Sequence, residues 1–231
     1  NENTAVGKDA LLTNVTGNNN VAVGYQSLYN NTVGPNIAVG RYALRANTTA
    51  NYNTAVVACA LLDNTTGACN TAIGNNALAN NTTASHNTAT GFNALLTNTT
   101  GSSNTATGKQ SLYANTTGQY NVAIGYAAMR YGTIAGYNTA VGFESLKANT
   151  TGQNNTAVGH EALKANTIEK VLSDNPEAYE YYLKAVYKYK HRQTLEDKEI
   201  SKGLLKKEFI KKLRNCGKSL KICGVNVTSK Y

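Results

Sequence analysis

Apolar and small residues recur at fixed places along the first 166 residues, in a phrase of about seventeen residues that reads NTAVGxxALxxNTTG. Eight of the nine steps between successive copies are seventeen residues long, and the step that contains Pro35 is sixteen. A constant period is typical of solenoid proteins and repeat arrays. The copies begin at Asn3, Asn20, Asn36, Asn53, Asn70, Asn87, Asn104, Asn121, Asn138 and Asn155.

Four positions of the repeat hardly vary. The third is Ala in every copy, the fifth is Gly except at Val57, the ninth is Leu except at Met129, and the twelfth is Asn except at Gly132. In an extended NTAVG segment, Asn, Ala and Gly share one face and Thr and Val the other. Asn and Gly in the NTTG segment suit a reversal of the chain. Each copy therefore predicts one short strand followed by turns.

Seventeen residues are too few for a repeat of two packed helices, which takes about 33–47. They suit one coil of a thin β-solenoid, with coils about 4.8 Å apart and a slim interior of Ala, Val and Leu. Stacked Asn side chains are expected to form ladders at the corners. We predict an all-β solenoid over residues 1–166, as a rod on the order of 45–50 Å long.

The fourth position of the repeat forms a continuous apolar stripe. Two placements are open: inside the coil opposite Leu, or packed against other chains around an axis, because a long exposed stripe would be unusual. The second favours a parallel homotrimer. The stripe comprises Val6, Val23, Val39, Val56, Ile73, Ile124, Val141 and Val158.

The pattern NTAVG-xx-AL-xx-NTTG resembles the head repeats of trimeric autotransporter adhesins, and is more similar still to tandem repeats in surface glycoproteins of giant algal viruses. Related repeats occur in bacterial surface and phage fibre proteins. The resemblance covers residues 1–166 and implies a left-handed parallel β-roll, trimerisation, and a place at the exterior of a virion or cell. The autotransporter head unit is usually shorter than seventeen residues.

The sixth and tenth positions vary and interleave aromatic with cationic residues. Aromatic faces and Arg side chains suit glycans and acidic polymers, and repetition offers avidity. The plainer interpretation, which the sequence favours, is a solvated surface with some packing between chains. The candidate glycan or partner surface comprises Tyr25, Arg41, Arg45, Phe92, Lys109, Tyr113, Tyr126, Arg130 and Phe143.

Two further interpretations of the repeat are weaker. Seven Asn residues at the twelfth position of the repeat begin N-x-T sequons, but they fall where turns need Asn and Thr, so structural use is favoured over glycosylation. An ice-binding array would need T-x-T on one strand face, whereas the repeat has adjacent Thr residues that point apart. The sequons begin at Asn14, Asn47, Asn64, Asn81, Asn98, Asn115 and Asn149.

The sequence predicts no enzyme, no metal site and no cofactor. His86, His160 and His191 are scattered, and the P-loop, G-x-G-x-x-G and G-x-S-x-G patterns are absent. The four cysteines show no zinc spacing; a Cys216–Cys223 disulfide is an open alternative, a Cys59–Cys69 disulfide is less favoured, and free buried thiols are the plainer interpretation.

Residues 167–231 form a second predicted domain, which is α-rich and basic. They hold 15 Lys and Arg against 8 Asp and Glu, whereas residues 1–166 hold 7 and 5. Helices are expected to begin at Asn175-Pro176 and after Thr194, and a hairpin around Cys223-Gly224. The domain is expected to cap the solenoid or to dock it on another virion or surface protein. The candidate docking residues are Lys206, Lys207, Lys211, Lys212 and Arg214.

The combined expectation is a structural protein of a viral particle, a trimeric fibre, spike or capsid-associated rod located in the virion. The alternative is a cell-surface or fibre adhesin that binds glycans through the variable positions, and a third is a scaffold without a ligand. The expected partners are other copies of the chain, other virion or surface proteins and, for the adhesin alternative, host glycans. The sequence disfavours nucleic acid and holds no apolar run of the roughly 18–20 residues that span a bilayer.

Overall fold

The computed structural model of the chain describes residues 2–164, 220–222 and 225–227. Two compact units make up the chain, Asn1–Asn166 and Thr167–Tyr231. The first contains the repeats and is a parallel β-solenoid, as the sequence predicts. The second is represented only by one short hairpin in the described residues.

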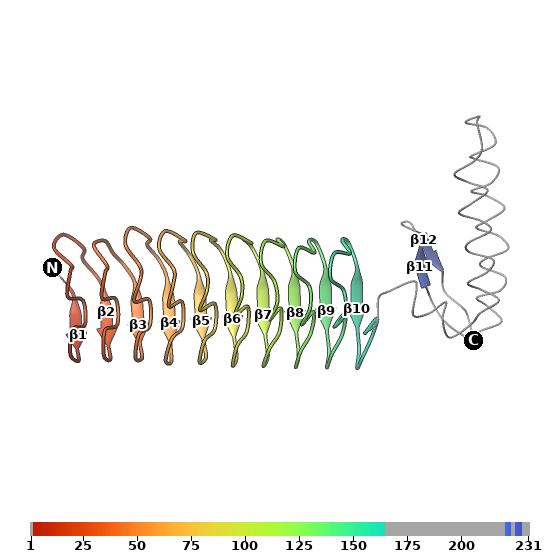
Figure 1. The fold of residues 1–231 in the computed structure, drawn as a ribbon, viewed down its shortest axis with the longest axis horizontal. Coiled ribbons are helices and arrows are strands. Elements are labelled where there is room, and N and C mark those ends of the chain that lie inside the picture. Colours follow the sequence, from red (N-terminus) through yellow and green to blue (C-terminus); the bar gives the residue numbers. More distant parts are fainter. Residues whose placement is uncertain (1, 165–219, 223–224, 228–231) are drawn as a thin grey trace, which may run out of the picture. The chain divides into compact units, whose positions relative to one another are not determined.

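Ten three-residue strands, one from each repeat, form a single parallel sheet in chain order (Figure 1). Each strand pairs with the next at the same place in the repeat, so Ala72 of one strand lies beside Ala89 of the next. The chain thus makes about nine turns of about seventeen residues, and the short step joins Val21 to Ile37. The strands are β1 Thr4–Val6, β2 Val21–Val23, β3 Ile37–Val39, β4 Thr54–Val56, β5 Thr71–Ile73, β6 Thr88–Thr90, β7 Thr105–Thr107, β8 Val122–Ile124, β9 Thr139–Val141 and β10 Thr156–Val158.

The core of the rod is narrow and is made of the invariant positions. In a middle coil, Ala72 from the strand meets Ala77 and Leu78 from the returning segment, and all three are fully buried. Because Ala contributes little apolar area, each coil gains most of its burial from the coils above and below it. The predicted alternation is confirmed: Asn and Ala of the strand segment point inward, and the residues on either side of Ala point outward.

Two rows of buried Asn side chains join the coils at the corners. In the first row, at position one, the Asn Oδ1 accepts a hydrogen bond from the backbone N–H of the next Asn, as between Asn70 and Asn87 at 2.9 Å. In the second row, at position twelve, each Nδ2 donates to the preceding Oδ1. Five such bonds of 2.7–3.0 Å run without a break from Asn31 to Asn115. The predicted Asn ladders are confirmed.

The return path of each coil is a series of turns with positive φ. The ninth-position residue of every coil, usually Leu, lies near φ +50°, as Leu78 does at 52°. Residues other than Gly and Asn seldom adopt this conformation. Here it directs the Leu side chain into the interior, and its complete burial offsets the backbone cost.

The fifth position requires Gly because the coils approach one another closely there. A Cβ added to Gly91, at φ +132°, would lie 2.8 Å from the carbonyl carbon of Gly108. Val57 is the exception, and it takes φ 86° while the glycines at this position lie between 124° and 142°. A β-branched residue at positive φ is strained.

Replacing Val57 with Gly is expected to stabilise the rod by about 1 kcal/mol, because relief of the strained φ exceeds the entropic cost of the glycine. The loss of apolar burial is only partial, since Val57 is 44% exposed. Urea unfolding followed by circular dichroism measures the change. The reverse substitution, Gly74→Val, is the matched control and should destabilise; a gain in stability there would contradict the argument.

The hairpin predicted around Cys223-Gly224 is confirmed. Strands β11 Leu220–Ile222 and β12 Val225–Val227 are antiparallel and are joined by two residues. The helices expected from Asn175 and Thr194, the docking residues Lys206 to Arg214, and the Cys216–Cys223 disulfide lie outside the described residues. Within the described part of the chain, no helix has the length and hydropathy needed to cross a bilayer.

Candidate binding surfaces of the rod

The first surface is the outward side of the ten-stranded sheet, here called the sheet face: the first and third residues of β1–β10. All of these residues are β-branched Thr, Val or Ile, and none is charged. Val39 is 37% exposed, Ile73 41% and Ile124 41%, so the apolar stripe lies outside the coil. The alternative that places the stripe inside, opposite Leu, is wrong because Ala alone fills that side of the narrow core.

The sheet face also carries two Thr pairs that the sequence argument against ice binding overlooked. In β6, Thr88 and Thr90 point to the same side, and Thr105 and Thr107 do so in β7. In the other eight strands the third residue is Val or Ile. The face is therefore a mainly aliphatic array with a short Thr-rich middle.

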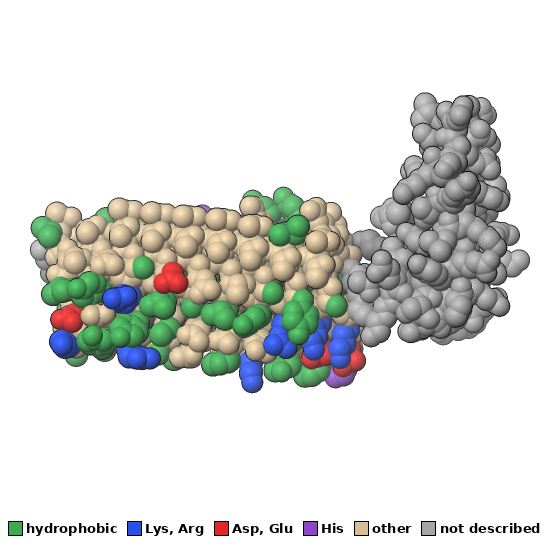
Figure 2. Space-filling view, viewed as in Figure 1, with side chains coloured by type: hydrophobic (Ala, Val, Ile, Leu, Met, Phe, Trp, Pro, Cys, Tyr) green, Lys and Arg blue, Asp and Glu red, His purple; other side chains and the backbone are tan. Residues whose placement is uncertain are grey.

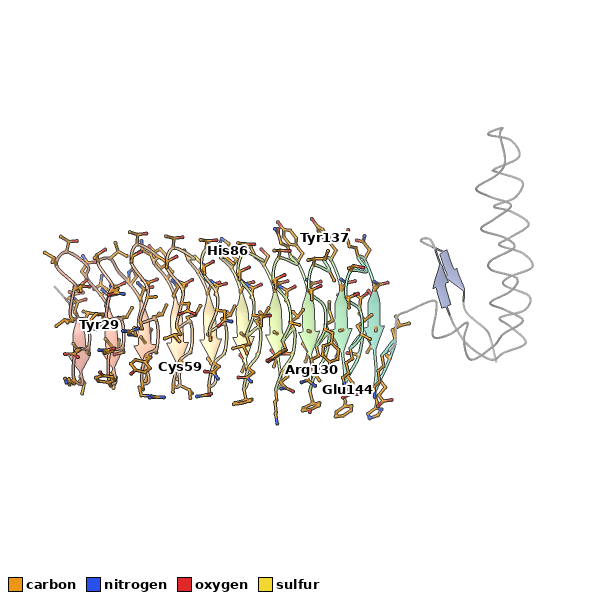
Figure 3. The ribbon with its side chains drawn as sticks, viewed as in Figure 1. Tyr29, Cys59, His86, Arg130, Tyr137 and Glu144 are labelled. Carbon is orange, nitrogen blue, oxygen red and sulfur yellow. The ribbon has the colours of Figure 1, made fainter. Side chains whose placement is uncertain are left out.

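The second surface, here called the charged edge, consists of repeat positions six, seven, ten and eleven. Every charged side chain between residues 3 and 164 is at one of these positions. Figure 2 shows the Lys, Arg, Asp and Glu side chains mostly along the lower half of the rod, while the upper half is mainly tan, the colour of the backbone and of uncharged polar side chains. In Figure 3, Arg130 and Glu144 lie near the lower edge. The charged edge includes all nine residues of the candidate glycan surface.

Aromatic rings on the charged edge stack on one another along the rod. Tyr126 and Phe143 lie 5.1 Å apart at an interplanar angle of 13°, and Phe143 and His160 lie 5.0 Å apart at 6°. The spacing is that of adjacent coils. The ring faces in this stack are therefore turned toward each other rather than toward solvent. Tyr25 packs instead at 58° against Tyr42.

The four cations of the candidate surface lie over aromatic rings. The Arg41 guanidinium is 4.9 Å from the ring centroid of Tyr42, and that of Arg45 is 5.5 Å from the same ring. Lys109 Nζ lies 5.9 Å from the centroids of both Phe92 and Tyr126. Such cation–π contacts are worth about 0.5–1 kcal/mol at exposed sites and fix the side chain. Arg130 lies in the same way over Tyr113, at 5.7 Å.

The last two coils contain the ion pairs of the described residues. Glu144 accepts hydrogen bonds from Lys147 Nζ at 2.5 Å and pairs with Lys164 Nζ at 2.6 Å, and Lys164 also pairs with Glu161 at 2.7 Å. The bond from Lys147, followed by that from Lys164, holds the pKa of Glu144 below its usual range. The bond from Glu144 raises the pKa of Lys164. These pairs are lost as pH falls through the lowered carboxyl pKa or rises through the raised lysine pKa.

A small aromatic cluster on the opposite side of the rod was not predicted. Tyr120 and Tyr137 stack at 5.0 Å and 18°, and each is more than half exposed. Both occupy position seventeen, as does His86, and Figure 3 shows His86 and Tyr137 on the upper edge. The repeat alignment contained the signal, because Tyr recurs at this position one period apart.

The seven sequons predicted to be structural are confirmed as such. The Nδ2 of each Asn donates to the backbone carbonyl three residues later and so closes a short turn. For Asn14 and Asn149 this bond is 2.9 Å long. Asn47, Asn64, Asn81, Asn98 and Asn115 are fully buried. A glycan on any of these five nitrogens is incompatible with the folded coil.

Cys59 and Cys69 are free thiols, Cys59 half-buried and Cys69 exposed. The less favoured Cys59–Cys69 disulfide is therefore absent; the expectation of free thiols is confirmed for this pair, and the expectation that they are buried is wrong.

Comparisons with known proteins give no match to a family model, a curated protein or a solved structure. The solenoid and its Asn ladders therefore stand on the structure itself, and the resemblance to viral and autotransporter repeats stays a hypothesis.

Proposed function

We propose that the chain is a structural protein at the exterior of a virus particle, in which three parallel copies of a left-handed β-roll form a fibre, spike or capsid-associated rod. The sheet face is the observation that carries the proposal. It is uncharged over all ten coils and carries Val or Ile at the third strand residue in eight of them, whereas the charged side chains gather on a different side of the coil. That division suits an assembly with the sheet faces around an axis and the charged edges in solvent.

Three properties of the sheet face support burial between copies. Its side chains are β-branched, so they lose little rotamer freedom on packing. The coils are in register from β1 to β10, so three parallel copies would meet with equivalent residues around the axis at every level. Val6, at one end, is 56% exposed and Val158, at the other, is 70% exposed, so the apolar surface extends along the full rod.

The place in a virion rests on the resemblance of the repeat and on the basic second domain. A rod of repeated coils extends a particle surface without a unique fold for each segment. Residues 167–231, with an excess of seven positive charges from 15 Lys and Arg against 8 Asp and Glu, would dock it on an acidic neighbour. The protein should then be detected by mass spectrometry in purified particles, and deletion of residues 167–231 should abolish its incorporation.

Sedimentation of the full chain tests the assembly. We expect a trimer that dissociates when Thr88 is replaced by Asp, because three carboxylates would meet in an apolar interface. Thr88 is already exposed in the single rod, so folding of the coil should be little affected. The matched variant Asn75→Asp adds the same charge at position six and should stay trimeric. A monomeric wild-type protein would overturn the trimer.

A second candidate function, that of a glycan-binding adhesin at a cell or fibre surface, is favoured by the arrangement of the charged edge. Its exposed cations are held in place by aromatic rings over several coils, which suits an extended ligand. Binding of the isolated chain on a glycan array tests this candidate, and the absence of any binding would exclude it.

A further inference from the structure

We propose that the charged edge binds a linear acidic polysaccharide that lies along the rod axis, with Arg41, Arg45, Lys109 and Arg130 as its contacts. The inference deepens the second candidate function, because it names the chemical class of the glycan. Its one link to the proposed assembly is that the charged edge must face solvent there.

Apart from Lys8, the cations of the charged edge are of two kinds. Lys147 and Lys164 are neutralised by Glu144 and Glu161. Arg41, Arg45, Lys109 and Arg130 belong to none of the ion pairs found in residues 2–164, and each lies over an aromatic ring instead. A ring holds a cation without cancelling its charge, so these four remain available to an anionic ligand.

The first pair of cations is fixed in coil three. Arg45 lies over Tyr42 and also over Tyr29, at 5.7 Å, and its Nε donates a 2.9 Å hydrogen bond to Gln26 Oε1. The Arg41 guanidinium also lies over the Tyr42 ring, and both arginines are exposed. A guanidinium binds sulfate or carboxylate through two parallel N–H donors. Because these side chains are already ordered, less conformational entropy is lost on binding.

The second pair lies in coils seven and eight. Lys109 is exposed and lies between Phe92 and Tyr126. Arg130 lies 5.7 Å from the ring centroid of Tyr113 and 5.2 Å from that of Tyr131, and its buried Nε has no hydrogen-bond partner. Coils three and eight are about 24 Å apart at about 4.8 Å a step. One extended polymer can reach both pairs, and two linked contacts bind more tightly than either alone.

The same geometry disfavours two other ligands. A neutral glycan would need open aromatic faces, but Tyr126, Phe143 and His160 stack on each other. Single-stranded nucleic acid also binds by stacking its bases on open rings. An acidic polysaccharide fits better, because its sulfate or carboxylate groups need cations but no open ring faces.

The experiment measures binding of the full chain to heparin, polygalacturonate, dextran and oligo-dT by surface plasmon resonance at two salt concentrations. Heparin or polygalacturonate should bind, and more weakly at the higher salt concentration, because cation–anion contacts release counterions. The comparison of the two shows whether sulfate or carboxylate is preferred. Binding of dextran as strong as that of the acidic polymers, or tighter binding of oligo-dT, would overturn the proposal.

A matched pair of variants locates the site. Replacing Arg41, Arg45, Lys109 and Arg130 with Gln should weaken polysaccharide binding about tenfold or more. Replacing Lys206, Lys207, Lys211 and Lys212 with Gln removes the same charge from the second domain and should leave binding within about twofold. The opposite result would overturn the proposal. Circular dichroism checks that each variant is folded, and the single variant Arg41→Gln, at an exposed position, gives an independent reduction if the fourfold variant unfolds.

Sedimentation of the same samples separates this proposal from the assembly. A monomer that binds the acidic polymers would overturn the trimer and leave the polysaccharide site standing. A trimer that binds neither heparin nor polygalacturonate would overturn the site alone.

Discussion

Replacing Asn81 with Ala is expected to lower the free energy of unfolding of the coils around it by about 3–5 kcal/mol. This figure is the sum of the penalties for the buried hydrogen-bonding groups that would lose their partners. Asn81 is fully buried near the middle of the position-twelve ladder. Its Nδ2 donates to Asn64 Oδ1 at 2.7 Å and to the Ala84 carbonyl at 2.9 Å, and its Oδ1 accepts from Asn98 Nδ2 at 2.9 Å.

The loss is large because the interior offers no replacement partners. Asn64 Oδ1 and one Asn98 N–H would be left without partners in a buried space that bulk water does not reach. The isosteric variant Asn81→Asp should be destabilised as well at neutral pH. Its carboxylate keeps the shape but cannot donate, and it would face Asn64 Oδ1.

Asn80→Ala is the matched control, because Asn80 is adjacent and exposed, and it should change stability by no more than about 0.5 kcal/mol. Solenoids unfold coil by coil, so amide hydrogen exchange is the suitable measurement. Faster exchange should centre on β5 and β6 in the Asn81 variants. Equal effects of the Asn80 and Asn81 substitutions would show that the ladder does not hold the coils together.

The sequence predicts the architecture of the rod because one coil repeats ten times. A constant step of seventeen residues sets the strand register, and the invariant Asn, Ala and Leu identify the side chains that face inward. The same argument locates the Asn ladders, since a buried Asn at every step has its nearest partner in the next coil. Each of these inferences needs only the spacing between copies.

What the sequence could not supply depends on the conformation within one coil. Leu at φ +50° has no sequence signal, because positive φ normally marks Gly or Asn. The outward position of the Val stripe depends on how little space the Ala-lined interior leaves. The division between ion-paired lysines and ring-held cations depends on which neighbours stand one coil away, which becomes visible only after the coils are stacked.

The eighth coil departs from the repeat at two positions that compensate for each other. Gly132 replaces the ladder Asn and Met129 replaces Leu. A Cβ built on Gly132 would lie 3.4 Å from Met129 Cε, so the longer side chain reaches toward the place of the missing amide. The cost falls on the neighbouring coil: Asn115 Oδ1 is buried and has no hydrogen-bond partner.

Restoring both consensus residues is therefore expected to stabilise the rod, whereas restoring only one is expected to destabilise it. Gly132→Asn alone should destabilise the rod by about 1–3 kcal/mol, because the amide and Met129 Cε compete for one space. Met129→Leu alone should cost less than about 1.5 kcal/mol. The free energy of unfolding of the double variant should exceed that of the wild type by about 1 kcal/mol, because the new Nδ2 can donate to Asn115 Oδ1. Urea unfolding of the four proteins gives the coupling energy. A coupling near zero would show that Met129 does not fill the gap in the ladder.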